Sequence, residues 1–171
     1  VMEEFKFTCS QCNEVHSAPL SVSFKKPDIE NVGAVLHSTP EVWVLGVDGD
    51  PEPQFFLRVI LKLKIIDLLE PFMWGVWVNV SEEELEQYES NGHVDGVCGM
   101  ISNSLPYYED TAFGIQAKLK PGVDDGQRPV LELSKAVSGN SEIVNDFIEG
   151  ISANKAQHIA ELCEHRIHCD K

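Results

Sequence analysis

Two cysteines near the N-terminus are the residues of this chain whose spacing most directly suggests chemistry. Cys9 and Cys12 are separated by two residues, and His16 follows four positions later. A tight turn between two thiolates at this spacing can bring both sulfurs to about 2.3 Å from one zinc ion, and an imidazole can add a third ligand. A closed structural site needs four ligands. The pattern therefore predicts half of a zinc knuckle.

Two interpretations of this segment stay open. No second pair of cysteines at the same spacing follows, so a fourth ligand would have to come from Cys98, Cys163, Cys169 or a distant histidine or carboxylate. Cysteine also commonly behaves as a small hydrophobic residue, so Cys9 and Cys12 could simply lie half-buried at a turn. Zinc is the one cofactor that the sequence indicates.

Signatures of catalysis are missing from the sequence. It contains no G-x-S-x-G nucleophile elbow, no phosphate-binding G-x-x-x-x-G-K, no H-E-x-x-H and no G-x-G-x-x-G. His93 and Asp95 lie in a glycine-flanked loop, but neighbours in sequence seldom form a catalytic pair. We therefore expect binding rather than catalysis, although the sequence does not decide whether the protein is an enzyme.

The charge balance indicates which partners to expect. The chain has 171 residues, with 13 basic and 28 acidic side chains and a formal net charge of −15. Such a field repels nucleic-acid phosphates and attracts basic surfaces. We expect a basic protein partner and no nucleic acid, against the simpler interpretation that acidity only keeps the protein soluble.

Cysteine usage and hydropathy indicate a compartment. Five cysteines, an odd number, do not fit the disulfide framework of a small secreted protein, and the first residues lack the pattern of a signal peptide. The longest apolar region, residues 55–69, is interrupted by charged residues and is too short to span a membrane. We expect a cytoplasmic protein that does not associate with membranes.

The elements that must position these residues follow from periodicity. Apolar, β-rich stretches predict strands at 42–47, 55–65 and 73–80, the first two paired. Alternating stretches at 115–119 and 130–133 predict a hairpin. The fold class expected is α+β, with an antiparallel sheet, an N-terminal cysteine knuckle and a C-terminal helix. A chain of this length and composition is expected to form a single domain, 1–171, with the knuckle (5–17) within it.

Two helices are predicted from their starts. Ser81 is a good N-cap and Glu84 completes a capping box, which predicts a helix from 82 to about 90. Apolar residues at helical spacing after Ser152 predict the C-terminal helix.

A partner-binding surface is expected around the first of these helices. Glu82, Glu83 and Glu86 form its acidic start, which also suits the positive end of the helix dipole. Trp77 lies just before them, and an exposed tryptophan beside acidic groups is typical of a protein-binding hot spot. Core packing is the alternative for each tryptophan, and the odd spacing of Trp74 and Trp77 predicts that they point to opposite faces of the sheet.

Several segments, in order along nearly the whole chain, resemble one bacterial family, catalogued as domain of unknown function 2199. They are the Cys9 and Cys12 pair with His16, residues 55–58 (FFLR), 72–78 (FMWGVWV) before 81–83, 105–111 (LPYYEDT), 128–133 (RPVLEL) and 149–151 (EGI). The resemblance implies a bacterial protein and no established activity. Asn13 and Val59 stand where relatives tend to have glycine, which implies an altered knuckle and an altered pocket.

Two functions from different classes follow. The first is a non-catalytic protein-binding protein, such as an immunity-type inhibitor, whose acidic surface neutralises a basic toxin or enzyme. The alternative is a zinc-stabilised structural or regulatory module in which Cys9, Cys12 and His16 are ligands.

Overall fold

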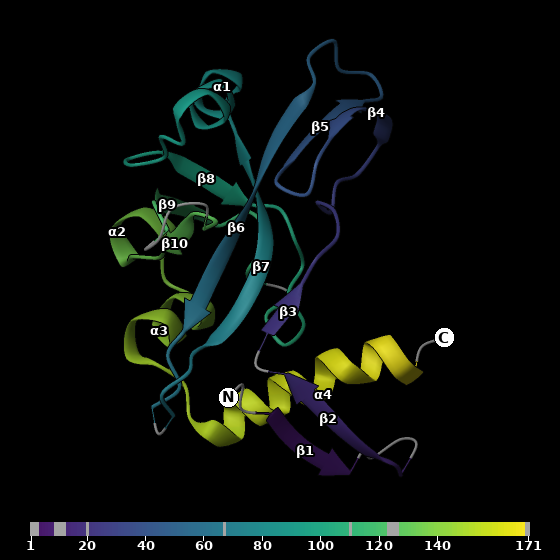
Figure 1. Ribbon diagram of the computed structural model, residues 1–171, viewed down its shortest axis with the longest axis vertical. Coiled ribbons are helices and arrows are strands. Elements are labelled where there is room, and N and C mark those ends of the chain that lie inside the picture. Colours follow the sequence, from purple (N-terminus) through teal and green to yellow (C-terminus); the bar gives the residue numbers. More distant parts are fainter. Residues whose placement is uncertain are drawn as a thin grey trace.

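The computed structural model describes residues 4–8, 13–19, 21–66, 68–109, 111–122 and 127–169 (Figure 1). The strands are β1 (Glu4–Thr8), β2 (Val15–Pro19), β3 (Ser21–Ser23), β4 (Val32–Ser38), β5 (Val42–Val47), β6 (Gln54–Leu63), β7 (Phe72–Val80), β8 (Cys98–Ile101), β9 (Gln116–Lys120) and β10 (Val130–Glu132). The helices are α1 (Glu82–Asn91), α2 (Lys135–Ser138), α3 (Glu142–Glu149) and α4 (Ala153–Cys169). The predicted α+β class is confirmed.

Five strands close into a barrel. β7, β8, β9, β10 and β6 pair in that order, and the long β6–β7 hairpin completes the ring. Residues on alternate positions of a strand face the same side. Leu57, Val59, Leu61 and Leu63 of β6 accordingly all lie in the main apolar core.

The predicted antiparallel sheet is in fact mixed. β10 pairs with β6 in parallel, and β3 pairs with β7 in parallel, while the other pairings are antiparallel. A parallel pair needs a long crossover connection. Here the chain between β6 and β10 includes β7, α1, β8 and β9, so local periodicity could not reveal the pairing.

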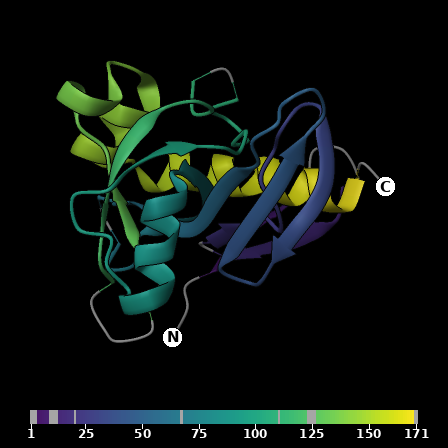
Figure 2. The same ribbon diagram turned by 90° about the horizontal axis from the view of Figure 1, so that it is seen from above.

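The β4–β5 hairpin extends the sheet beyond the barrel, and β4 is its terminal strand (Figures 1 and 2). β5 pairs with the first half of β6, as predicted. The register of β4 shifts twice, between Val32 and Val35 and between Val35 and His37. Irregularities of this kind bend a terminal strand and discourage the pairing of a further strand.

A second, smaller apolar cluster lies on the outer face of the sheet. It consists of Leu45, Phe56 and Trp77, with Phe24, Ile29 and Trp43 packed against it. Trp74 belongs to the main core instead. The prediction that Trp74 and Trp77 point to opposite faces is therefore confirmed.

Both predicted helices are confirmed. The backbone N–H of Glu84 donates to the Ser81 hydroxyl, and the backbone N–H of Ser81 donates to the Glu84 carboxylate, so α1 begins with the expected capping box. At the start of α4, the backbone N–H of Lys155 donates to the hydroxyl of Ser152. Among the described residues, no helix is long and apolar enough to cross a membrane.

The β1–β2 hairpin is separate from the eight-stranded sheet and packs against α4 (Figure 1). Its register pairs Thr8 with Val15 and Phe7 with His16. Cys9 and Cys12 lie outside the described residues. The chain thus enters the cysteine segment from a strand, and the knuckle itself stays a prediction.

Candidate binding groove

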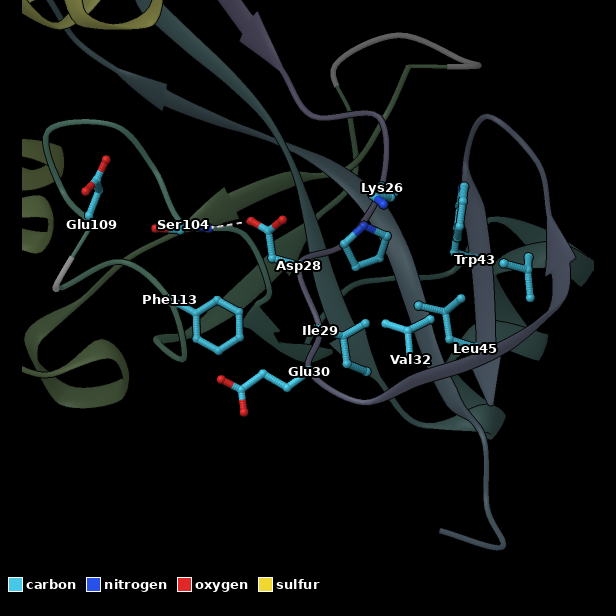
Figure 3. A pocket seen from close by; sticks show the side chains of 12 residues that line it. Lys26, Asp28, Ile29, Glu30, Val32, Trp43, Leu45, Ser104, Glu109 and Phe113 are labelled. Atoms are coloured by element: carbon cyan, nitrogen blue, oxygen red, sulfur yellow. Dashed lines mark hydrogen bonds between the residues drawn. The ribbon is translucent and has the colours of Figure 1, made fainter. Parts of the chain in front are cut away.

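A groove of about 880 Å³ opens on the outer face of the sheet. It lies between the β4–β5 hairpin, the segment that joins β3 to β4, and the loop that follows β8. Its apolar lining consists of Pro27, Ile29, Val32, Val35, Trp43, Leu45 and Phe113. In Figure 3, Ile29 and Val32 lie between Phe113 on one side and Trp43 on the other.

Several of these apolar side chains are open to water. Val32 is 45% exposed, Val35 is 51% exposed and Phe113 is 48% exposed. Single exposed apolar residues are ordinary on a protein surface, but several that line one hollow are typical of a binding site. The groove has the concave, largely apolar character that ligand and peptide sites share.

Charged side chains border the groove. Among the described residues, Asp28, Glu30 and Glu109 line it, and Lys26 is the one basic lining residue. The apolar lining therefore has a mainly negative border. A bound segment that carries positive charges beside its apolar side chains would match this border.

Asn103 holds one wall of the groove in place. Its side chain is fully buried. The Asn103 Oδ1 accepts a hydrogen bond of 2.8 Å from the backbone N–H of Trp77, and its Nδ2 donates to the carbonyl of Lys26 at 3.0 Å. The carboxylate of Asp28 also accepts from the backbone N–H of Ser104 at 2.9 Å. These bonds tie the segment that joins β3 to β4 onto β7 and the loop after β8.

Trp77 anchors the same segment from the sheet. Its indole N–H donates to the carbonyl of Phe24 at 3.0 Å. Its ring packs edge-on against the ring of Trp43, with 6.1 Å between the two ring centroids. Trp77 is completely buried. The expectation that Trp77 offers an exposed ring to a partner is therefore wrong for this structure, whereas Trp43 is partly exposed and lines the groove.

A polar network fixes the opposite wall. Lys155 on α4 contacts Asp146 at 2.6 Å and Glu142 at 2.8 Å, both on α3. The hydroxyl of Tyr108 donates to Asp146 at 2.6 Å, and the hydroxyl of Tyr107 donates to Glu142 at 3.0 Å. The loop after β8, which carries Phe113, is thereby fastened to α3 and α4.

The protonation states of Lys155 and Tyr108 in this network fit a structural role. Burial disfavours the charge on Lys155, but hydrogen bonds to Asp146 and Glu142 outweigh it and raise the pKa of Lys155. Burial, together with the hydrogen bond to Asp146, also raises the pKa of Tyr108 far above its usual range. A general base must release its proton near neutral pH. Lys155 and Tyr108 keep theirs, so neither of these two side chains acts as one.

Tyr107 shows the backbone strain of this loop. Its φ is 76°, in the left-handed region that a tyrosine seldom adopts. The ring is held by the ammonium of Lys155, 5.0 Å from its centroid, and by the ring of His158, 5.8 Å away. Contacts on several sides are what such a strained conformation needs to persist.

The residues that the sequence singled out do not meet in one place. Glu82, Glu83 and Glu86 are exposed on α1, as expected, whereas Trp77 is in the outer cluster. The groove was missed because Asn103 and Phe113 lie in an irregular segment without periodicity. The apolar residues within 32–36 were the signal in the sequence, but this stretch gave no clear element by pattern alone.

The described residues contain no group of three or more histidine, cysteine or acidic side chains arranged to hold a metal ion. Cys98 is exposed on β8, which lies at the opposite end of the molecule from the β1–β2 hairpin (Figure 1). Cys163 is buried on α4, the helix that packs against that hairpin. Of these two cysteines, only Cys163 lies on an element next to the hairpin.

A family model described as an uncharacterised protein conserved in bacteria, domain of unknown function 2199, matches residues 8–151. The chain belongs to this family. The range that the family model matches includes every residue that lines the groove. No curated protein matches the chain. No solved structure matches it either.

Proposed function

We propose that this member of the family is a non-catalytic protein-binding protein that holds a basic, apolar segment of a partner in the groove. The observation that carries the proposal is the set of water-exposed apolar side chains lining one hollow, bordered mainly by carboxylates. Apolar burial would supply affinity, and the charged border would select basic segments.

The wider charge of the molecule supports the same partner. The net charge of −15 and the exposed Glu82, Glu83 and Glu86 on α1 extend the negative field beyond the groove. Such a field accelerates encounter with a basic protein and weakens as salt is added. An immunity-type inhibitor of a basic toxin or enzyme is the specific form of this function that we favour.

Selection from a library of displayed random peptides on the immobilised wild-type protein tests the proposal. We expect enriched peptides to combine large apolar side chains with lysine or arginine. The triple variant Glu82→Lys, Glu83→Lys, Glu86→Lys should still retain them, with slower association and a weaker dependence on salt, because α1 steers and the groove binds. Enrichment of acidic peptides, or of none, would contradict the proposal.

A zinc-stabilised module is the second candidate. The antiparallel register of β1 with β2 pairs Thr8 with Val15, which lie before and after the cysteine-containing segment, and His16 is on the second of these strands. Cys9, Cys12 and His16 would hold the ion, and zinc would add folding free energy to this hairpin.

Metal content and melting temperature test this candidate. We expect about one zinc per chain and a fall in Tm when a chelator is added, because zinc stabilises the folded state that binds it. Cys9→Ser should abolish both effects, while Cys98→Ser, at the distant exposed cysteine on β8, should change neither. Equal behaviour of Cys9→Ser and the wild type would exclude the zinc module.

A further inference from the structure

Two of the three arginines of this acidic chain lie close together where the β4–β5 hairpin joins the barrel. Arg58 is on β6, and Arg128 lies just before β10. The start of β5 and the start of β10 both meet β6 near this point. The charges that gather here are independent of the groove, whose lining includes neither arginine.

Arg128 is paired with the carboxylate of Glu41. The Nε of Arg128 contacts Glu41 Oε2 at 2.8 Å, and its Nη2 donates to Glu41 Oε1 at 3.2 Å. This is the two-point geometry in which a guanidinium group binds a carboxylate best. The charge of Glu41 is thereby matched to that of Arg128.

Arg58 has no such partner among the described residues. Its Nη1 makes one long hydrogen bond, 3.4 Å, to the carbonyl of Pro40, and its guanidinium carbon lies 5.7 Å from the centroid of the Trp77 ring. Its Nε is buried and has no hydrogen-bond partner within the part of the chain that the structure describes. Burial and the positive charge of Arg128 both lower the pKa of Arg58.

We infer that Arg58 and Arg128 form a binding site for a carboxylate group of a ligand. Among the described residues, two guanidinium groups and the carboxylate of Glu41 leave one positive charge unmatched, which a single carboxylate would neutralise. The planar fork of an arginine suits carboxylate geometry, and a cation that is partly desolvated gains more from a counter-charge than one in water. Both side chains are partly exposed, so a ligand can reach the pair.

The Nε–H signals of the three arginines in a ¹H–¹⁵N NMR spectrum test this site. Acetate should shift the signals of Arg58 and Arg128 in a saturable way, at constant ionic strength against chloride, while Arg166 serves as the internal reference. Acetate represents a free carboxylic acid, and the peptide Ac-Gly-Glu-Gly-NH₂ represents the side chain of a protein partner. The probe that saturates at the lower concentration identifies the source of the carboxylate.

Two variants sharpen the test. Arg58→Gln should weaken the response of Arg128 at least about tenfold, equivalent to about 1.4 kcal/mol. Glu41→Gln should strengthen binding, because it removes the carboxylate that competes for Arg128. The site is overturned if neither carboxylate gives a saturable shift, if all three arginines shift alike, if Arg58→Gln binds like the wild type, or if inorganic phosphate binds and acetate does not.

Discussion

Replacing Asn103 by alanine is expected to lower the free energy of unfolding by about 2–4 kcal/mol. The buried side chain serves two backbone groups, the N–H of Trp77 and the carbonyl of Lys26. Removing it leaves the buried N–H of Trp77 and the partly buried carbonyl of Lys26 without this partner, and a fully buried unpaired polar group costs about 1–3 kcal/mol. Urea titration monitored by tryptophan fluorescence measures the change.

Two further variants separate this role from a general effect of substitution. Asn103→Asp keeps the size and the acceptor for Trp77, but it loses the donors and places a carboxylate near Asp28, whose Oδ2 is 3.4 Å from the Asn103 Nδ2. The variant should be less stable than the wild type at neutral pH, and it should regain part of the lost stability in acid. Asn91→Ala is the control, because Asn91 makes one exposed local hydrogen bond to the backbone N–H of His93. Equal stability of Asn103→Ala and Asn91→Ala would contradict the role given to Asn103.

Replacing Lys155 by methionine is expected to lower the free energy of unfolding by about 2–3 kcal/mol. Methionine keeps an unbranched stem against Tyr107 but leaves Asp146, only 14% exposed, without its counter-charge. Lys120→Met is the matched control. Lys120 makes an equally short contact of 2.6 Å with Glu132, but these side chains are 53% and 41% exposed. An exposed pair contributes less than about 1 kcal/mol, so equal losses in the two variants would argue against the network.

The same network predicts that the stability of the folded protein depends on pH. The hydrogen bond from Lys155 lowers the pKa of Glu142, against the effect of partial burial, and the hydroxyl of Tyr107 adds to this lowering. A carboxylate with a lowered pKa stabilises the folded state above its unfolded pKa, and this contribution is lost as the pH falls through the folded value. The difference in Tm between the wild type and Glu142→Gln should therefore be full at neutral pH and disappear in acid. A difference that persists unchanged in acid would contradict this assignment.

The elements that the sequence predicted correctly are those with a local signature. The apolar, β-rich stretch 55–65 predicted β6, and Ser81 with Glu84 predicted the start of α1, because each pattern is set by neighbours in the chain. The closure of the barrel depends on the pairing of Val130 with Ile60. Residues so far apart in sequence leave no local trace of their contact.

The candidate site was harder to predict for the same reason. The groove is built from three segments that meet only in the folded chain, and its support depends on Asn103, a polar residue in an irregular stretch. Trp77 was misplaced because an amphipathic ring next to acidic residues suits both a surface and a core. In the folded chain, the segment that joins β3 to β4 covers this ring, so Trp77 is buried.

Binding of one selected peptide to two variants of β4 tests the central claim most directly. Val35 and Leu36 are neighbours on one strand and are 51% and 59% exposed, but only Val35 lines the groove. Isothermal titration with a peptide enriched on the wild-type protein should show that Val35→Asp weakens binding at least about tenfold, a cost of about 1.4 kcal/mol. Leu36→Asp should bind like the wild type. Equal binding by both variants, or a greater loss in Leu36→Asp, would show that the groove is not the binding site.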